Sequence, residues 1–458
     1  MELVLSDSQK RVFEAIKNKQ NILITGAAGC GKTFFIKWLS KVYCDRKIGI
    51  TAMTGVAATL YEQGKTLHSW GGIGLAKGSE DDILRNVRKN KKAKENWIES
   101  SMLIIDEVSM MTIELFEKLD YVARKLRKSE SFYGGLQIVL CGDFCQLPPV
   151  GSSKYCFESE LFMTNIDCYL LEENFRQQTD SEFQDLLDEL RYGFLSKENN
   201  LKLKSRIVNE IPPNEHGIIP TQVFPKNVEV DSINEEEYSN LINENNTEHS
   251  YECNTKVMDN ENTVLLKETH ILFQKASEFM DKTSLLQKEL KLCIGSQVML
   301  VVNYDMELKL ANGTRGIVSG FSEISPYYPI VTFRNGTKQV ISSFPVTHDL
   351  GYATITRSQV PLKLAWAITV HKSQGMTLDY IISDLSNVFL HSQIYVTLSR
   401  VRSLDGLYLQ GINLAKIKCD KKVKDFYDAL KNGTYKKQKK NAFSQLMKQS
   451  NIKSGCLI

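Results

Sequence analysis

The chain of 458 residues contains no run of about twenty apolar residues, the length that a membrane-spanning helix requires. Its first residues also lack the basic, apolar and small-residue regions of a secretory signal peptide. Both absences predict an intracellular, soluble protein: cytoplasmic in a bacterial or viral setting, nuclear in a eukaryotic one. We expect neither secretion nor a membrane as partner.

The closely spaced cysteine pairs typical of zinc sites, Cys-x-x-Cys, are missing as well. The ten cysteines are scattered, with no Cys-x-x-Cys pair and no histidine at zinc-binding spacing, so neither a disulfide framework nor a zinc site is indicated. The net charge is only +3, which does not by itself indicate nucleic-acid binding. Basic residues cluster locally, at 85–94 and 436–440, where phosphate contacts and plain solvent exposure are both open interpretations.

What the sequence does contain is a complete phosphate-binding pattern near its start. Three apolar residues, Ile22 to Ile24, predict a buried strand, and glycines then allow a tight turn before a helix opens at Lys32. The stretch fits G-x-x-x-x-G-K-[ST] in full. We predict that it holds a polyphosphate, with Lys32 reaching the β- and γ-phosphates and Thr33 binding Mg²⁺. The expected nucleotide contacts are Gly26, Ala27, Ala28, Gly29, Cys30, Gly31, Lys32, Thr33 and Phe34.

Gln9 lies just before this stretch and has two possible roles. Ser6 precedes apolar residues at helical spacing, and together with Gln9 it fits a capping box at the start of a helix. The alternative is that the Gln9 amide binds a nucleotide base. The sequence leaves both interpretations open.

Two carboxylates follow the apolar run from Met102 to Ile105. Asp106 and Glu107 stand at the carboxyl end of this predicted strand, where doubly wound sheets bind their ligands. We expect Asp106 to hold the Mg²⁺ that Thr33 also contacts, and Glu107 to polarise an attacking water.

A third apolar run, Gln137 to Cys141, leads into the stretch from Gly142 to Val150. Gln146 stands where a side-chain amide can sense a γ-phosphate. A turn stiffened by Pro148 and Pro149 is the alternative, and the two interpretations are compatible.

Two further loops predict contacts with a single strand of nucleic acid. Small residues around Thr54 and Gly55 allow close approach to the backbone, and the stretch 64–72 combines hydroxyl, histidine and aromatic side chains between glycines. The residues concerned there are Thr66, His68 and Trp70, which we expect in an exposed loop. Core packing is the alternative for the histidine and the tryptophan.

These motifs, in this order, resemble the petite-integration-frequency (PIF) family of DNA helicases, in superfamily 1B and related to RecD-type enzymes. The segment from Glu114 to Gly135 resembles the family's own signature, and the similarity extends over nearly the whole chain, with departures at Cys145 and Ser392. The resemblance implies an α/β fold. It comprises two RecA-like parallel-sheet P-loop domains, a small helical insertion and a small antiparallel β-barrel of the Src-homology-3 type.

The expected domain boundaries follow from this comparison and from changes in residue pattern. The first RecA-like domain is expected at 1–164, with the helical insertion at about 74–98, and the second at 165–310 together with 361–430. Short alternating runs with Asn-Gly turns place the barrel at 311–360. The Lys-rich end, 431–458, is expected to be a mobile basic tail.

The resemblance also assigns roles in the second domain. It implies that Arg176 and Arg400 are arginine fingers, since a guanidinium suits a phosphate that gains charge in the transition state; a surface ion pair is the alternative for Arg176. Gly375 is an expected nucleotide contact. The expected DNA contacts are Lys226, Asn227, His371, Lys372 and Ser373.

The function implied is that of an ATP- and Mg²⁺-dependent 5′-to-3′ DNA helicase that acts as a monomer in replication, repair or recombination. It would track on single-stranded DNA and unwind duplexes from single-strand junctions, and also four-stranded guanine structures. An RNA-directed helicase of the same superfamily and a DNA-binding module without ATPase activity are the alternatives.

Overall fold

The computed structural model describes most of the chain. The described residues are 5–58, 60–61, 64–149, 151–209, 217–224, 227–243, 247–259, 263–284, 286–305, 307–308, 310, 312–334, 336–350, 352–373, 375–378 and 380–435, without the side chains of 227–228, 282–283, 349 and 371–372. The expected contact Lys226 and nearly all of the expected tail, from 436 on, lie outside these residues.

Six parallel strands form the first sheet, in the order β3-β2-β4-β5-β1-β6. The central strands are continuous apolar runs, as expected for strands buried on both faces. Because all six are parallel, their carboxyl ends meet at one edge of the sheet. The strands are β1 (Ile22–Thr25), β2 (Ile48–Ala52), β3 (Lys65–Thr66), β4 (Met102–Asp106), β5 (Gln137–Gly142) and β6 (Asp167–Leu170).

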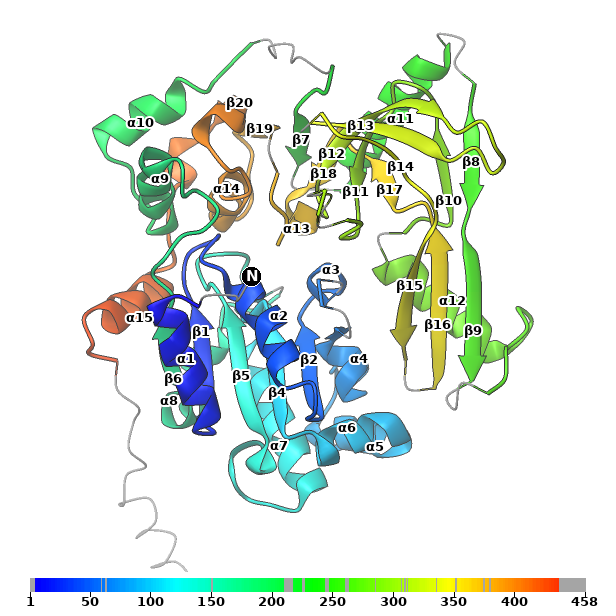
Figure 1. Ribbon diagram of the computed structural model, residues 1–458. Helices are drawn as coiled ribbons and strands as arrows, with labels where there is room; N and C mark the ends of the chain where they lie inside the picture. The colour runs from blue at the N-terminus through cyan, green and yellow to red at the C-terminus, as the bar shows by residue number, and fades with distance from the viewer. Residues whose placement is uncertain are drawn as a thin grey trace, which may run out of the picture.

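Helices cover this sheet in the lower half of Figure 1. The capping box at Ser6 and Gln9 is confirmed at the start of the first helix. The expected helical excursion is confirmed as well, as α5 (Glu80–Lys89) and α6 (Lys91–Glu99). The other helices here are α1 (Asp7–Lys17), α2 (Lys32–Val42), α3 (Gly55–Ala58), α4 (Leu67–Gly71), α7 (Ile113–Arg127) and α8 (Glu160–Asn165).

A second parallel sheet has the strand order β18-β7-β19-β20. It faces the first sheet from above in Figure 1, so the expected pair of parallel-sheet units is confirmed. Its strands are β7 (Thr221–Phe224), β18 (Ala367–Thr369), β19 (Ile381–Leu385) and β20 (Leu407–Ile412). Its helices are α9 (Ser181–Arg191), α10 (Lys197–Lys204), α11 (Asn227–Asn243), α13 (Val370–Ser373) and α14 (Ser392–Leu398).

The last described helix, α15 (Lys421–Lys431), leaves the second sheet and returns to the first. It contacts β6, the strand at the edge of the first sheet. The first unit is therefore built from both ends of the described chain, and β6 belongs to it although it follows residue 164.

Small antiparallel sheets lie beside the two parallel ones (Figure 1). One has the order β14-β13-β12-β11-β17, another β15-β16-β9, and β10 pairs with β8. The strands are β8 (His249–Glu252), β9 (Asn254–Asp259), β10 (Glu289–Leu292), β11 (Gln297–Leu300), β12 (Arg315–Phe321), β13 (Pro329–Phe333), β14 (Lys338–Val340), β15 (Phe344–Asp349), β16 (Ala353–Gln359) and β17 (Leu362–Leu364), with helix α12 (Ile271–Thr283) against β16 and β9.

These sheets differ in two ways from the expected barrel at 311–360. Strands β11 and β17 lie outside that range yet pair in the five-stranded sheet, whereas β15 and β16 lie inside it and pair with β9. The stretch that contains β17 and β18 is also divided between two sheets: β17 is antiparallel to β11 and β18 is parallel to β7. An apolar run does not reveal which neighbour each of its residues will pair with.

Among the described helices, none combines the length and apolar character needed to cross a bilayer.

Candidate functional site

The glycine-rich turn after β1 has the conformation expected of a phosphate cradle. Gly29 and Gly31 have φ of +87° and +81°, and α2 begins directly after Gly31. A Cβ on Gly26 would lie 2.6 Å from the carbonyl oxygen of Leu171, and one on Gly29 would lie 2.7 Å from the Cβ of Arg176. Glycine is therefore required both by the backbone and by the segment that follows β6.

The Lys32 side chain lies along this turn. Its ammonium donates hydrogen bonds to the carbonyl oxygens of Gly26, at 2.8 Å, and of Ala27, at 2.9 Å. Burial opposes its charge, but attraction to Cys30 and Asp143 outweighs burial and raises the pKa of Lys32 above its ordinary value. Lys32 thus places a positive charge beside the amino end of a helix. The charge and the helix end together favour binding of an anionic phosphate.

Asp106 is the last residue of β4 and lies at the same edge of the sheet as the cradle. Both of its carboxylate oxygens accept hydrogen bonds. One accepts a hydrogen bond from the Glu107 amide at 2.8 Å, and the other accepts one from the Tyr61 hydroxyl. Burial raises the pKa of Asp106. The Tyr61 hydroxyl also interacts with Thr33, so this tyrosine lies between the two residues expected to bind Mg²⁺.

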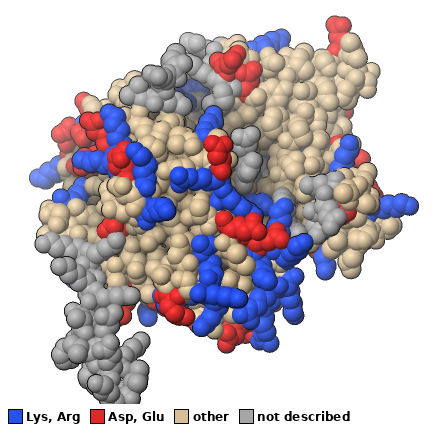
Figure 2. All heavy atoms as spheres, turned by 60° about the horizontal axis from the view of Figure 1, so that its bottom comes forward, with Lys and Arg blue, Asp and Glu red and all other residues tan. Residues whose placement is uncertain are grey.

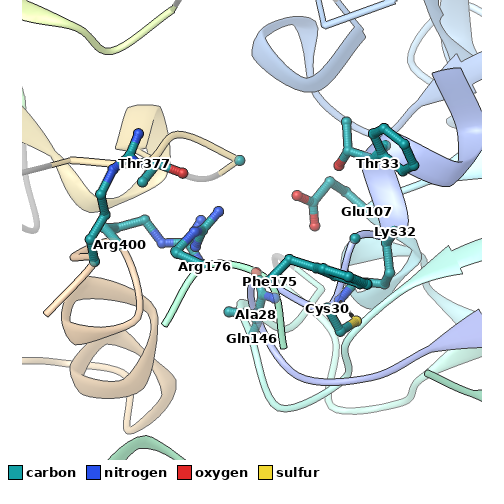
Figure 3. Close-up of a pocket in the computed structure, with 15 residues that line it drawn as sticks. Ala28, Cys30, Lys32, Thr33, Glu107, Gln146, Phe175, Arg176, Thr377 and Arg400 are labelled. Atoms are coloured by element: carbon teal, nitrogen blue, oxygen red, sulfur yellow. Dashed lines mark hydrogen bonds between the residues drawn. The ribbon is translucent and has the colours of Figure 1, made fainter. Parts of the chain in front are cut away.

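A cavity of about 320 Å³ joins these groups to residues of the second unit. In Figure 3, Lys32, Thr33 and Glu107 lie on one side, and Arg176 and Arg400 lie on the other. Its lining is Ala28, Gly29, Cys30, Gly31, Lys32, Thr33, Phe34, Glu107, Gln146, Phe175, Arg176, Gly375, Thr377, Arg400 and Arg402. Residues more than three hundred positions apart in the sequence therefore share one cavity.

The two arginines are held by neutral groups. Arg176 donates to the carbonyl oxygen of Ser399 at 2.7 Å, and Arg400 donates to the carbonyl oxygen of Val396 at 2.8 Å and to the Ser399 hydroxyl at 2.9 Å. Within the described part of the chain, neither forms an ion pair, so the surface ion pair considered for Arg176 is absent there. Burial and the neighbouring Arg400 lower the pKa of Arg176 to about 9, and burial also lowers the pKa of Arg400. Concentrated positive charge of this kind favours a multiply charged anion.

One end of the cradle suits a nucleotide base. Gln9 is 1% exposed, its Oε1 accepts the Ser6 amide in the capping box, and its Nε2 is a buried donor with no partner in the structure. A Cβ on Gly31 would lie 3.0 Å from that Nε2 and 3.1 Å from the ring of Phe175. An amide donor beside a partly exposed ring can bind the edge and face of a base, so the capping and base-binding interpretations of Gln9 are compatible.

Behind the cradle, Asp143 is the centre of a buried polar network. Arg191 of α9 pairs with it at 2.9 Å, and the hydroxyls of Tyr427 and Tyr395 donate to it at 2.9 and 3.3 Å. The Tyr395 hydroxyl also accepts the Ala28 amide at 2.9 Å. Arg191 lowers the pKa of Asp143 against the effect of burial. The network joins the cradle to helices α9, α14 and α15.

The expected DNA contacts have mixed outcomes. Thr54 and Thr66 cap the short helices α3 and α4 through their hydroxyls, and burial lowers the pKa of His68. Gly55 and Thr66 line a small cavity that Phe279 and His348 close from the antiparallel unit. Their assignment to DNA stays a prediction.

Two of these residues lie in the core, and the exposed loop expected at Trp70 is wrong. Trp70 lies in α4 with 5% of its surface exposed, and its ring lies against Gly49 and 5.0 Å from the ring of Trp97. Ser373 is fully buried and donates to the carbonyl oxygen of Val370 at 2.8 Å. Both side chains lie in the core, so neither is exposed for contact with a DNA strand in this structure. The side chains of Asn227, His371 and Lys372 lie outside the described set.

Several residues of the site were not found from the sequence. Phe175 stands next to the predicted arginine finger Arg176, and its aromatic character was an available signal for base stacking. Asp143 stands in the stretch from Gly142 to Val150, but its bonds to Arg191 and Tyr427 depend on partners distant in the chain. Tyr61 carried no comparable signal.

The basic cluster at 85–94 lies on α5 and α6, at the end of the first unit away from the cavity. Figure 2, which brings this end forward, shows lysines and arginines gathered on it. Arg85 pairs with Asp82 within α5, and both are exposed. The cluster is thus a solvated surface remote from the cavity.

Comparison with known proteins agrees with this geometry. The model of the PIF1-like helicase family matches residues 4–201, and that of the DNA helicase Pif1 2B domain matches residues 278–321. The ATP-dependent DNA helicase PIF1 of Xenopus laevis is 34% identical over 93% of this chain, and that of Homo sapiens is 34% identical over 94%. The chain spans 64% of the length of each.

A solved structure of the same family is similar to this chain over its whole length. The Pif1 helicase from Candida albicans is 32% identical, with a TM-score of 0.73 over 93% of this chain and 100% of that one. The cradle, the facing arginines and these similarities lead to one assignment: the chain belongs to the PIF1-like helicase family.

Proposed function

We propose that this protein is an ATP- and Mg²⁺-dependent DNA helicase that moves 5′ to 3′ along single-stranded DNA. The observation that carries the proposal is the shared cavity, in which Lys32 faces Arg176 and Arg400 from the opposite unit (Figure 3). A site divided between two units makes hydrolysis depend on their relative position, and this is the requirement for a motor.

Each wall of the cavity has its own task. The cradle amides and Lys32 bind the β- and γ-phosphates, while Arg176 and Arg400 stabilise the charge that develops on the γ-phosphate during transfer. Glu107 lines the cavity with Gln146. We assign Glu107 to the attacking water and Gln146 to sensing the γ-phosphate.

One feature of the chain and one of a relative support ATP as the nucleotide. The buried Nε2 of Gln9 has no partner and provides a donor for a base beside Phe175. Among relatives, the Pif1 of Bacteroides sp, 25% identical, is known in complex with ADP-AlF4. These observations favour an adenine nucleotide over a bare polyphosphate.

Thr33 and Asp106 fit a Mg²⁺ site, since a hydroxyl and a carboxylate are oxygen ligands suited to this ion. When bound, the ion supplies charge that neutralises the phosphates. The Tyr61 hydroxyl lies between these residues and bonds to Asp106. Binding of the ion would therefore require the Tyr61 hydroxyl to move away from Asp106.

The DNA substrate is supported by relatives. The relatives from Xenopus laevis and Homo sapiens are named DNA helicases, and a 25% identical Bacteroides Pif1 is known bound to single-stranded DNA. In this chain, the proposed contacts on the first unit remain Thr54, Gly55, Thr66 and His68. Those on the second are Lys226, Asn227, His371 and Lys372. Action as a monomer on intracellular DNA is part of the same proposal.

The decisive experiment is strand displacement with matched DNA duplexes that carry a 5′ tail, a 3′ tail or no tail. We expect ATP-dependent unwinding of the 5′-tailed duplex alone. Unwinding of the 3′-tailed duplex would reverse the proposed polarity, and displacement only from RNA tracking strands would favour the RNA-directed alternative. Strand binding without any ATP hydrolysis would favour the module without ATPase activity.

A further inference from the structure

The hydroxyl of Tyr395 reaches the cradle from the second unit. Tyr395 lies in α14, 367 residues after Ala28, and its side chain is buried. Its hydroxyl oxygen accepts the amide N–H of Ala28 at 2.9 Å. Ala28 is buried as well and lines the shared cavity (Figure 3). The backbone of the cradle is thus bonded directly to a side chain of the opposite unit.

The Tyr395 hydroxyl has a defined direction, because its own proton has a partner. It donates to a carboxylate oxygen of Asp143 at 3.3 Å, and Asp143 is paired with Arg191 at 2.9 Å. Burial and the charge of Asp143 raise the pKa of Tyr395, so the hydroxyl keeps this proton at neutral pH. With the proton directed to Asp143, the oxygen offers a lone pair to the Ala28 amide.

The Ala28 amide needs an acceptor, because a buried N–H without a partner is unfavourable. Gly29 follows with φ of +87°, and a glycine allows the peptide before it to turn at little cost. Without the hydroxyl, the Ala28 amide would turn toward another acceptor and move the amides that follow. Those amides, up to Lys32, are the ones expected to hold the phosphates.

We propose that Tyr395 is a positioning residue for nucleotide binding: its hydroxyl holds the Ala28 amide and thereby keeps the glycine-rich turn in the shape that binds phosphate. Tyr395 is not one of the described residues that line the cavity, so it acts through the backbone of the cradle. The ligand concerned is the polyphosphate of ATP, and in this respect the proposal rests on the proposed function.

A role in the arginine wall is the alternative, because the next residue, Val396, accepts a hydrogen bond from Arg400 through its carbonyl oxygen. Kinetics separate the two roles. The cradle binds ATP and the transition state alike, so a disturbed cradle raises KM and leaves kcat nearly unchanged. A disturbed arginine wall lowers kcat instead, because the arginines act on charge that develops during transfer.

The test compares Tyr395→Phe with the unmodified full chain. Phenylalanine keeps the ring in the core and removes only the hydroxyl. We expect KM for ATP in DNA-stimulated hydrolysis to rise about tenfold, as befits one lost buried hydrogen bond, with kcat within about threefold. The Kd of a non-hydrolysable ATP analogue, measured by calorimetry, rises by the same factor. Affinity for single-stranded DNA without nucleotide stays unchanged.

Tyr133→Phe is the matched control. Tyr133 is also a fully buried tyrosine, and its hydroxyl donates to the carbonyl oxygen of Phe116 at 2.9 Å. We expect a lower urea midpoint in both variants and a changed KM in Tyr395→Phe alone. An unchanged KM and Kd in Tyr395→Phe, or an equal rise in Tyr133→Phe, overturns the positioning role. A fall in kcat at constant KM overturns it in favour of the arginine wall.

A second measurement requires no variant. Hydrogen–deuterium exchange of the peptide from Gly26 to Gly31 follows the Ala28 amide in the nucleotide-free chain, and we expect this amide to be protected. Rapid exchange there overturns the bond to Tyr395. A protein that binds the analogue but hydrolyses no ATP refutes the proposed function instead, and calorimetry and exchange still decide the role of Tyr395.

Discussion

The two walls of the cavity are built on different principles. On the cradle side, the phosphate-binding groups are backbone amides and Lys32, set by glycine conformations within eight consecutive residues. On the arginine side, Arg176 and Arg400 come from segments more than two hundred residues apart and are held by carbonyl and hydroxyl groups. All residues of the first wall come from one short stretch of sequence. The residues of the second wall come together only when the chain folds.

This difference indicates different tasks in the proposed reaction. A cradle fixed by its own backbone binds the nucleotide in every state of the protein. Neither arginine of the other wall forms an ion pair among the described residues, and in the proposed reaction this wall reaches the phosphates only when the two units close. The cradle therefore serves binding, and the arginine wall couples hydrolysis to motion.

The largest expected effect comes from removing the cation of the cradle wall. Lys32→Ala abolishes ATP hydrolysis, because the β- and γ-phosphates lose the lysine ammonium of that wall. Single-stranded DNA affinity, measured by fluorescence anisotropy without nucleotide, stays unchanged. Lys37→Ala on the same helix is the matched control and keeps full turnover. DNA-stimulated turnover retained in Lys32→Ala would show that this wall has been assigned the wrong task.

The arginine wall is tested by Arg400→Ala. We expect turnover to fall by about a thousandfold or more, as when other phosphoryl-transfer enzymes lose an arginine finger. Affinity for a non-hydrolysable ATP analogue, measured by calorimetry, falls far less, because the cradle remains. Arg85→Ala removes an exposed arginine of α5 and serves as control. Near-normal turnover in Arg400→Ala would remove this residue from the site.

The network that joins the two walls is tested by Arg191→Ala. Arg191 and Asp143 are 4% and 0% exposed in their ion pair, so the variant leaves a buried carboxylate without its cation. We expect a loss of about 3–5 kcal/mol in the free energy of unfolding, measured with urea.

The control for that loss is Lys424→Ala, which breaks an exposed pair with Asp428 and costs about 0–1 kcal/mol. Equal, small losses in the two variants would mean that Asp143 is not a structural link between the walls.

The smallest expected effect is that of Tyr61→Phe on the cradle wall. Asp106 loses one hydrogen-bond donor, which we expect to cost about 1 kcal/mol of stability by thermal or urea unfolding. Tyr43→Phe, whose hydroxyl has no bond to the site, is the control. A gain in stability on removing the Tyr61 hydroxyl would mean that this contact opposes the fold.

Most of the fold and of the cradle could be predicted from the sequence, since short-range rules govern them. Buried parallel strands read as apolar runs, and the glycine pattern before Lys32 fixes both a turn and a helix start. The two-sheet architecture and the positions of Arg176 and Arg400 came from resemblance to a family. Their convergence on one cavity became visible only in the structure.

The features that could not be predicted depend on contacts with distant parts of the chain, which a sequence does not specify. Trp70 was expected in an exposed loop, but Gly49 offers it a space in the core that only the folded sheet creates. Leu362–Leu364 and Ala367–Thr369 form one apolar stretch, yet they pair with strands of different sheets. Tyr61 reaches Asp106 from a segment whose sequence has no motif. In each case long-range contacts decided the outcome.

Helix α15 has a consequence for how the protein is made. Its Tyr427 hydroxyl bonds to Thr25 at the end of β1, to the Phe144 amide and to Asp143. During synthesis, the first hundred and seventy residues leave the ribosome long before Tyr427 does. The first unit therefore cannot complete its own interior until the last described helix has been translated.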